Sequence, residues 1–154
     1  MAVEPGQLAP EFTLKDQAGN DVSLADYRGK QPVVLVFYPF TFTGVCQGEL
    51  CEIRDDPSLF ESSECAVLAI SCDTRHAQAV WAEQQGFTFP VLADFWPHGA
   101  VAKAYGVFNE KLGCANRGSF VIDKDGTIVA AFASVDLATP REREEYKAAL
   151  AKLT

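Results

Sequence analysis

Two apolar segments constrain the fold of this chain most strongly: Val33–Tyr38, with the sequence VVLVFY, and Ala66–Ser71, with the sequence AVLAIS. Each is a continuous apolar run of strand length, as expected for a strand that is covered on both faces. A helical pattern follows each run, at Gly44–Arg54 and at Thr74–Gln85, and Gly86 is typical of a helix C-cap. This β-α-β-α alternation predicts parallel strands in the middle of a sheet.

Antiparallel pairs are expected on either side of this centre. Residues 12–14 and 22–24 alternate apolar and polar side chains around Ala18-Gly19-Asn20, which predicts an N-terminal β-hairpin. Ser119–Ile122 and Thr127–Ala133 flank an Asp-Lys-Asp-Gly turn sequence, which predicts a second hairpin. We therefore predict an α/β fold with a mixed central sheet flanked by helices.

A final helix has a clear start signal. Thr139 is expected as its N-cap, Pro140 as its first residue and Glu142 as the partner in a capping box. Tyr146, Leu150 and Leu153 then form the buried stripe. No linker, repeat or low-complexity tract interrupts the chain, so residues 1–154 are predicted to form a single domain.

The charge balance argues against nucleic-acid binding. Thirteen Lys and Arg face twenty-one Asp and Glu, which gives a formal net charge of -8. The densest basic stretch, Arg141–Lys147, is interleaved with glutamates and is predicted to be a solvated helix face rather than a phosphate-binding patch.

The longest apolar run is far shorter than the roughly twenty residues that a membrane-spanning helix needs. Glu4 and Pro5 stand where a signal peptide would carry positive charge and then an apolar segment. We therefore expect a cytoplasmic protein without membrane contact. Thiols stay reduced in that compartment, so the five cysteines, an odd number, are expected to be catalytic or inert rather than a disulfide framework.

Cys46 has the most informative position of the five. It follows the strand Val33–Tyr38 by a short loop and is predicted to lie in the first turn of a helix. A free thiol is only about 3% ionised at pH 7, and the unpaired amides of a helix N-terminus favour the thiolate, which is the nucleophile. In open α/β sheets, sites also form at the carboxyl ends of strands, where this loop begins.

The residues around Cys46 resemble a known family. The pattern Pro39-x-x-x-Thr43-x-x-Cys46, together with a distant Arg117, resembles the active site of the peroxiredoxins. Longer segments, FTGVCQGEL at 42–50, DFWPHGA at 94–100 and YGVFNE at 105–110, resemble the alkyl hydroperoxide reductase E type of that family. The resemblance covers residues 9–153 and implies a thioredoxin-like fold and a thiol peroxidase that works without a cofactor or metal.

The resemblance also implies roles for individual residues. Cys46 attacks the peroxide, Arg117 contacts sulfur and peroxide, and the Thr43 hydroxyl and the Cys46 amide bind peroxide oxygens. Pro39 shields the sulfur from water. Glu49, one helical turn after Cys46, is expected to hold a guanidinium in place. Each donor aimed at the developing charge could contribute about 3 to 4 kcal/mol, by analogy with oxyanion holes.

Two resemblances conflict on which thiol reacts with the Cys46 sulfenic acid. Cys51 follows at Cys-x4-Cys spacing, which resembles the Q or bacterioferritin-comigratory type, whereas the E-type enzymes typically lack that cysteine and use an external thiol. On an ideal helix the two Cα atoms would lie about 8.6 Å apart, beyond the roughly 7 Å that a disulfide allows. A Cys46–Cys51 disulfide is the preferred hypothesis, and it requires the first turns of the helix to unwind.

Alternatives remain for this step. A low-molecular-weight thiol or a thioredoxin-, glutaredoxin- or mycoredoxin-like protein could reduce Cys46 directly, or Cys72 or Cys114 could resolve it. Cys65 and Cys72 bracket a buried strand and are expected to be structural. Cys114 precedes Arg117 by three residues, and it could lie near the site or be an exposed bystander.

Other functions are less well supported by the sequence. Cys72-x3-His76 has an acceptable spacing for metal ligands, but only two histidines exist and no Cys-x-x-Cys pair is present, so we predict no metal site. A thiol peroxide sensor shares the first oxidation step and remains an alternative.

Aromatic residues give three further expectations. Trp81 is expected in the core, and Trp96 near the active-site region. Phe40 and Phe42 suggest a substrate collar or a subunit contact, and the family resemblance favours a homodimer.

Overall fold

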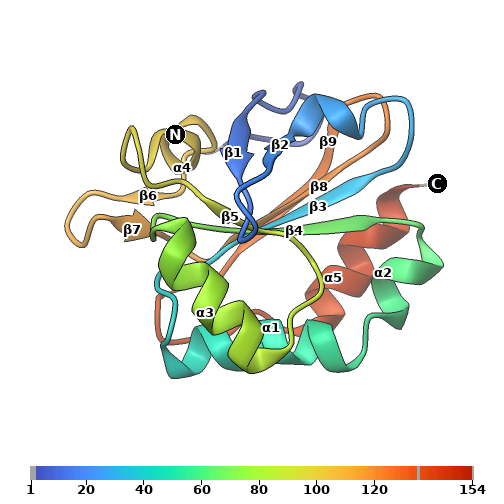
Figure 1. Cartoon of the computed structure of the whole chain (residues 1–154). Coiled ribbons are helices and arrows are strands. Elements are labelled where there is room, and N and C mark those ends of the chain that lie inside the picture. The colour runs from blue at the N-terminus through green and yellow to red at the C-terminus, as the bar shows by residue number, and fades with distance from the viewer. Residues whose placement is uncertain (1–2, 135, 154) are drawn as a thin grey trace.

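The two apolar segments lie side by side at the centre of the sheet in the computed structural model, which describes residues 3–134 and 136–153. They form β3 (Val33–Phe37) and β4 (Ala66–Ser71), which pair in parallel from Val33 opposite Ala66 to Phe37 opposite Ile70. Every residue of β3 is buried. The prediction of buried, parallel central strands is therefore confirmed (Figure 1).

The remaining strands build a mixed seven-stranded sheet in the order β2-β1-β5-β4-β3-β8-β9. The pair β4 and β5 is parallel, whereas the other additions to the sheet are antiparallel. Both predicted hairpins are present, as β1 with β2 and as β8 with β9. The bounds are Thr13–Lys15 for β1, Asp21–Ser23 for β2, Val91–Ala93 for β5, Gly118–Ile122 for β8 and Ile128–Ala133 for β9. A separate two-stranded ribbon consists of β6 (Phe108–Asn109) and β7 (Cys114–Ala115).

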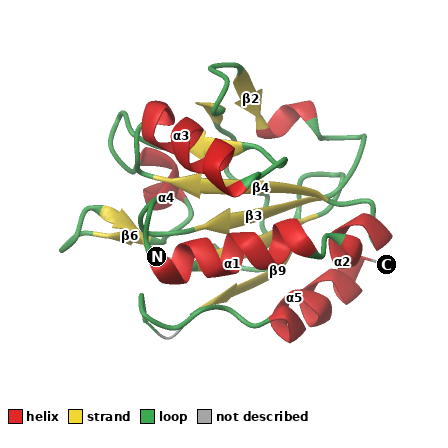
Figure 2. Ribbon diagram, turned by 60° about the horizontal axis from the view of Figure 1, so that its bottom comes forward, coloured by secondary structure: helices red, strands yellow, loops and turns green. Residues whose placement is uncertain are grey.

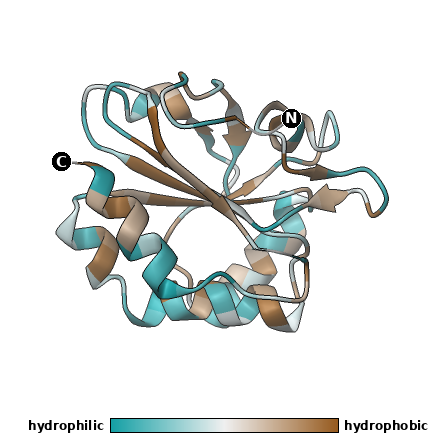
Figure 3. Cartoon of the chain, turned by 180° about the vertical axis from the view of Figure 1, so that it is seen from behind, coloured by the Kyte–Doolittle hydropathy of each residue, from teal (hydrophilic) through white to brown (hydrophobic). Residues whose placement is uncertain are grey.

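Helices cover both faces of this sheet (Figures 1 and 2). One face carries α1 (Gly44–Asp55), α2 (Ser58–Ser62), α3 (Arg75–Gln85) and α5 (Arg143–Leu150), which is followed by the 3-10 turn η2 (Ala151–Leu153). The opposite face packs against α4 (Ala100–Ala104), the turn η1 (Leu24–Asp26) and the N-terminal hairpin. The strands are apolar and the outer helix faces hydrophilic (Figure 3), so the core lies in two layers, one on each side of the sheet.

The ends of α3 are those that the sequence predicts. The Thr74 hydroxyl accepts a hydrogen bond from the Ala77 amide at 3.2 Å, and Gly86 closes the helix with φ of 70°. Trp81 is fully buried, as expected, against Tyr38 and Phe87.

The start of the last helix differs from the prediction. α5 begins at Arg143 with Glu142 as its N-cap, and the Glu142 amide donates to the Glu145 carboxylate at 2.8 Å, so Thr139 and Pro140 lie outside the helix. The reason is a long-range contact: the backbone amide and the side chain of Arg141 both bind Glu49 of α1. The predicted solvated face is therefore also wrong for Arg141, which is 3% exposed.

The later part of this helix matches its predicted stripe. Tyr146 and Leu150 are buried, while Leu153 lies in η2 and is partly buried. Among the described residues, no helix is both long and apolar enough to cross a membrane.

Gly118, the first residue of β8, gives a test of this packing. An added Cβ would lie 2.7 Å from Cγ1 of the buried Val107, so Gly118→Ala should lower the free energy of unfolding by about 1 to 3 kcal/mol in urea denaturation. The matched control is Gly48→Ala on the exposed face of α1, where no atom lies within 4 Å of the new Cβ. That change should instead stabilise the protein by roughly 0.5 to 1 kcal/mol. Equal stability of the two variants would contradict this packing.

Candidate active site

Cys46 is the third residue of α1, and its side chain is fully buried. Thr43 is the N-cap in extended conformation, and its carbonyl accepts the first helical hydrogen bond, from the Gln47 amide at 2.9 Å. The amides of a first helical turn have no carbonyl partner within the helix. The predicted position of Cys46, in the first turn of a helix at the carboxyl end of β3, is therefore confirmed.

The loop that carries Cys46 is tied to the neighbouring strand. The Thr41 amide donates to the Asp73 carboxylate at 2.8 Å, and the Thr41 hydroxyl lies 3.0 Å from the Tyr38 hydroxyl. Phe42 has φ of 68°, a left-handed conformation that is uncommon for a bulky residue. Its ring packs 6.4 Å from that of Trp81. These contacts fix the path of the loop into α1.

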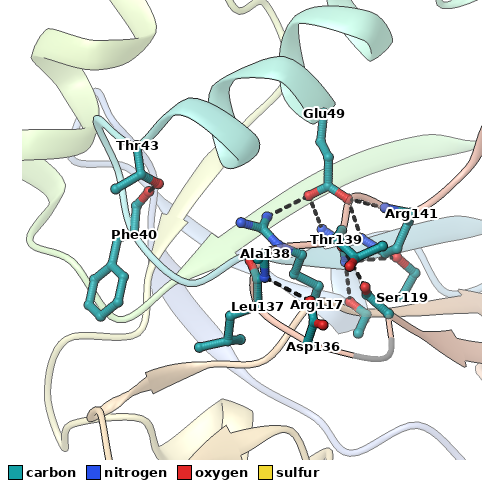
Figure 4. Close-up of polar contacts among 12 residues, drawn as sticks. Phe40, Thr43, Glu49, Arg117, Ser119, Asp136, Leu137, Ala138, Thr139 and Arg141 are labelled. Carbon is teal, nitrogen blue, oxygen red and sulfur yellow. Dashed lines mark hydrogen bonds and ion pairs between the residues drawn. The ribbon is translucent and has the colours of Figure 1, made fainter.

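Thr43 is the last residue of this loop, and its side chain is exposed. Its hydroxyl donates to the Phe40 carbonyl at 2.6 Å (Figure 4). Because the proton is committed to that carbonyl, the lone pairs of the Thr43 oxygen stay free to accept a hydrogen bond from a substrate hydroxyl.

Glu49 lies one helical turn after Cys46 and binds two buried guanidinium groups (Figure 4). Nη1 of Arg117 donates to Glu49 Oε1 at 2.7 Å, while Nε of Arg117 donates to the Leu137 carbonyl at 2.8 Å. The expectation that Glu49 holds a guanidinium agrees with this arrangement.

The second guanidinium belongs to Arg141, which the sequence analysis did not identify as a site residue. Its Nη2 donates to Glu49 Oε1 at 2.8 Å, and its Nε and backbone amide donate to Oε2 at 3.0 and 2.6 Å. Its Nη1 binds the Gly118 carbonyl and the Ser119 hydroxyl. Arg141 therefore joins α1 to the start of β8. Its only sequence signal was a Pro-Arg pair before a helix, which carries no chemical meaning by itself.

The electrostatics of this cluster favour full ionisation. Burial alone would raise the pKa of Glu49, but the hydrogen bonds and the charge of Arg141, with the charge of Arg117, hold that pKa below its ordinary value. The pKa of Arg141 is raised, because the neighbouring anionic groups outweigh the opposing effect of its burial. Arg117 and Arg141 carry two positive charges against the single negative charge of Glu49, so the cluster has a net positive charge.

A cavity opens next to this charge. Its volume is about 220 Å³, and it is lined by Pro39, Phe40, Thr43, Gly44, Val45, Arg117 and Leu137. Pro39 is buried, and the lining combines apolar side chains with one guanidinium. The loop before α1 and the Arg117 guanidinium thus enclose a space that suits a small molecule with one polar end.

Cys51 lies on the same helix as Cys46, half-buried, with its thiol 3.6 Å from Gln85 Oε1 of α3. Helix α1 is continuous over both residues, and both thiols are free. Two residues at this spacing on an intact helix are about 8.6 Å apart at Cα, too far for a disulfide.

The other cysteines are shielded from solvent to different degrees. Cys65 precedes β4 and is half-buried, and burial raises its pKa to about 12. Cys72 follows β4 and is buried, and its pKa is also raised to about 12, first by burial and then by Asp94 and other nearby anions. Cys114 is buried in β7, so the alternative that it is an exposed bystander is wrong.

Of the two tryptophans, Trp81 lies in the core as expected, whereas Trp96 is not packed. Trp96 is 82% exposed, whereas the indole nitrogen of the buried Trp81 donates to the Gln47 side chain of α1 at 3.1 Å. Trp81, rather than Trp96, is therefore the tryptophan in contact with the site helix. His76 and His98 are exposed, and within the described residues no group of three or more acidic, Cys or His side chains could hold a metal ion.

Comparison with known proteins gives a consistent picture. A model of the AhpC/TSA family matches residues 5–131. The chain is 56% identical to the alkyl hydroperoxide reductase E of Mycobacterium tuberculosis over 123 residues, which is 80% of each protein. It is 40% identical to a thioredoxin peroxidase of Echinococcus granulosus over 138 residues, 83% of this chain and 70% of that protein.

Solved structures agree with the sequence comparisons. The crystal structure of peroxidoxin BcpB from Mycobacterium tuberculosis aligns with a TM-score of 0.84 at 32% identity, covering 98% of this chain and 96% of that one. AhpC from Enterococcus faecalis aligns with a TM-score of 0.86 at 29% identity, covering 98% and 92%. The predicted thioredoxin-like fold is confirmed by these structures.

Glu49→Gln tests the role of the buried carboxylate. Removing its charge leaves Arg117 and Arg141 without their counter-ion, so the free energy of unfolding at pH 7 should fall by about 3 to 5 kcal/mol in urea denaturation. The folded-state pKa of Glu49 is lowered, so its stabilising contribution is complete above the ordinary value of 4.5 and is lost as the pH falls through the folded value. The gap between wild type and variant should therefore narrow in acid.

The matched control for this experiment is Glu52→Gln, an exposed glutamate on the same helix. It should change stability by less than about 0.5 kcal/mol. A Glu49→Gln protein as stable as this control would contradict the importance of the buried ion cluster.

Proposed function

Because the chain belongs to the AhpC/TSA family, whose members are thiol-dependent peroxidases, we propose that the Cys46 thiolate is the nucleophile that reduces the peroxide. The observation that supports this proposal is a buried cysteine in the first turn of α1, one helical turn before Glu49, which together with the Leu137 carbonyl holds the Arg117 guanidinium in a fixed orientation.

The site residues have distinct roles in this reaction. The Cys46 sulfur attacks one peroxide oxygen, the O–O bond breaks, and the departing oxygen gains negative charge. Arg117 and the Cys46 amide donate hydrogen bonds to the developing charge, and the Thr43 oxygen accepts one from the peroxide hydroxyl. Fixed donors of this kind contribute about 3 to 4 kcal/mol each in other enzymes. Pro39 and the cavity wall keep bulk water from the sulfur.

The cavity volume supports a range of peroxides. Its roughly 220 Å³ far exceeds the 10 to 15 Å³ or so that one water molecule needs, so hydrogen peroxide leaves space for an organic substituent. Phe40, Val45 and Leu137 line that space with apolar surface. We include hydrogen peroxide, organic hydroperoxides and peroxynitrite among the substrates.

The reaction leaves Cys46 as a sulfenic acid, which Cys51 is proposed to resolve. Attack by the Cys51 thiol forms the Cys46–Cys51 disulfide and releases water. The intact α1 keeps the two residues apart, so its first turns unwind for this step. Gly48 lies between them and weakens the helix at that point. A thioredoxin-, glutaredoxin- or mycoredoxin-like protein then reduces the disulfide.

Two alternatives use the same first step. In one, a low-molecular-weight thiol or an external redoxin reduces the Cys46 sulfenic acid directly, and Cys51 is a packed residue that donates to Gln85. In the other, the protein is a peroxide sensor that is oxidised once without turnover.

The proposed oligomeric state is a homodimer. The exposed rings of Phe40 and Phe42, at 39% and 52%, support a subunit contact through the loop that precedes α1.

Stopped-flow oxidation of the reduced protein, followed by mass spectrometry, tests the assignment. Cys46→Ser should abolish the fast phase. Cys51→Ser should retain it and, in excess peroxide, accumulate Cys46 as sulfenic or sulfinic acid. A fast phase that survives in Cys46→Ser would refute the nucleophile. Normal cycling of Cys51→Ser with a reductant would favour the external-thiol alternative, and a single stoichiometric oxidation would favour the sensor.

Gly48→Ala separates attack on the peroxide from closure of the disulfide. The new methyl group meets no atom within 4 Å, so it strengthens α1 by up to about 1 kcal/mol without crowding. Unwinding becomes harder, and closure of Cys46–Cys51 should slow by about fivefold. The fast oxidation phase should be unchanged, because it takes place on the intact helix. Closure at the wild-type rate would show that unwinding of this segment does not limit the step.

A further inference from the structure

Thr41 is a buried residue in the middle of the loop that precedes α1. It is 8% exposed, whereas Phe40 and Phe42 on either side of it are exposed. Its hydroxyl lies 3.0 Å from the Tyr38 hydroxyl, and its backbone amide donates to Oδ2 of Asp73 at 2.8 Å. Asp73 lies just beyond the end of β4 and has no role in the proposed reaction. The loop is therefore fastened through Thr41 to the end of the neighbouring strand.

A single peptide group connects this fastening to Thr43. The amide that Asp73 binds belongs to the same peptide group as the Phe40 carbonyl, which accepts the Thr43 hydroxyl at 2.6 Å (Figure 4). A peptide group is planar, and in the trans form present here its N–H and C=O point to opposite sides. A rotation of the plane would therefore disturb both hydrogen bonds together. Because the Asp73 carboxylate holds the N–H, it also fixes the direction of the carbonyl that orients the Thr43 hydroxyl.

The Asp73 carboxylate is itself held by buried groups. Nε2 of Gln78 in α3 donates to the Ser71 hydroxyl oxygen at 2.9 Å and to the Leu92 carbonyl at 2.8 Å. The Ser71 hydroxyl has one proton, which it donates to Oδ2 of Asp73 at 2.7 Å. Ser71 and Gln78 are both fully buried. The oxygen that binds the Thr41 amide is thus held in place by the core contacts of β4 and α3.

The conformation of the loop needs such an anchor. Phe42 has φ of 68°, and a left-handed conformation of this kind costs free energy and persists only where the surrounding contacts maintain it. Without Asp73, the amide of the buried Thr41 would also lose its acceptor. Both effects would favour a rotation of the peptide group that follows Phe40, and the Thr43 hydroxyl would then lose its fixed direction.

We propose that Asp73 is a positioning residue for peroxide binding, which acts on the Thr43 hydroxyl through the peptide group that follows Phe40. The inference rests on the proposed function, in which the Thr43 oxygen accepts a hydrogen bond from the peroxide hydroxyl. Asp73 itself does not touch the substrate. It keeps the Thr43 proton committed to the Phe40 carbonyl, so that the lone pairs of Thr43 stay available in the cavity that both residues line.

The test measures the second-order rate constant for oxidation of Cys46 by hydrogen peroxide, in stopped-flow experiments on the full chain. Asp73→Ala removes the acceptor and should lower this constant by about 10- to 100-fold, as expected for the loss of a hydrogen bond to a charged group. Asp73→Asn still offers an oxygen to the Thr41 amide and should stay within about threefold of wild type. Oxidation of Asp73→Ala at the wild-type rate would overturn the proposal, and so would an Asp73→Asn protein as slow as Asp73→Ala.

A double-mutant cycle identifies the path of the effect. Thr43→Val removes the hydroxyl, and it leaves the N-cap of α1 intact because the Thr43 side chain makes no capping hydrogen bond. It should slow the oxidation at least as much as Asp73→Ala does. If Asp73 acts through that hydroxyl, adding Asp73→Ala to Thr43→Val should slow the oxidation by less than about twofold more. Losses that simply multiply would overturn the proposed path.

Thr74→Ala is the matched control. Thr74 follows Asp73 and is the N-cap of α3, where its hydroxyl accepts from the Ala77 amide at 3.2 Å. Its replacement should lower the thermal stability of the protein without touching the loop, so the rate constant should stay within about twofold of wild type. A loss of rate in Thr74→Ala equal to that in Asp73→Ala would mean that general destabilisation is the cause, and it would overturn the proposal.

Ser71→Ala replaces Asp73→Ala if that protein does not fold. It removes the hydroxyl that holds Oδ2 of Asp73 and should lower the rate constant by about threefold, with no further effect on Thr43→Val. An unchanged rate constant in Ser71→Ala would then overturn the proposal.

The outcomes also separate this inference from the proposed function. If Cys46→Ser retains the fast phase, the proposed nucleophile is wrong and this inference fails with it. If Thr43→Val is oxidised at the wild-type rate, the role of Thr43 and this inference fail while the role of Cys46 stands. If Cys46→Ser and Thr43→Val behave as proposed but Asp73→Ala is as fast as wild type, this inference alone is overturned.

Discussion

The Glu49 carboxylate, buried between two guanidinium groups, is the interaction on which the arrangement of the site depends. It connects α1 to Arg117 at the entrance of β8 and to Arg141 before α5, two segments that lie 68 and 92 positions away in the sequence. Burying three charges costs free energy, and the close hydrogen bonds offset that cost only while all three groups remain. The cluster therefore makes the position of the Cys46 helix depend on segments from the whole length of the chain being folded together.

Local patterns were sufficient for most of the fold. The apolar runs that became β3 and β4, the two hairpins and the capped helix α3 all depend on neighbours in the sequence, and all were predicted correctly. The beginning of α5 was not, because Thr139 and Pro140 carry a good local signal that the contact between Arg141 and Glu49 overrides. No pattern in the sequence indicates that a basic residue next to several glutamates will instead pair with a carboxylate on another helix.

The residues of the candidate site also fall into those that the sequence identified and those that only the structure revealed. Pro39, Thr43 and Cys46 lie close together in the sequence, so their spacing and resemblance to a family loop were enough to select them. Arg117 was selected only through that resemblance, and Arg141 was missed. The burial of Cys114 depends on a short ribbon, β6 with β7, whose strands are too brief to leave a periodic signal. Such features come from the folded chain as a whole.

Helix α3 contains no group that meets the peroxide in the proposed reaction, yet its residues Trp81 and Gln85, one turn apart, bind three side chains of α1: Gln47, Cys51 and Arg54. The Trp81 indole donates to Gln47, the neighbour of Cys46, and the Gln85 side chain accepts from Cys51 itself, so α3 contacts α1 close to both cysteines. The energetic cost of opening α1 therefore includes contacts that α3 supplies. Substitutions in this outer helix alone would therefore change the rate of the proposed disulfide closure while both cysteines stay in place.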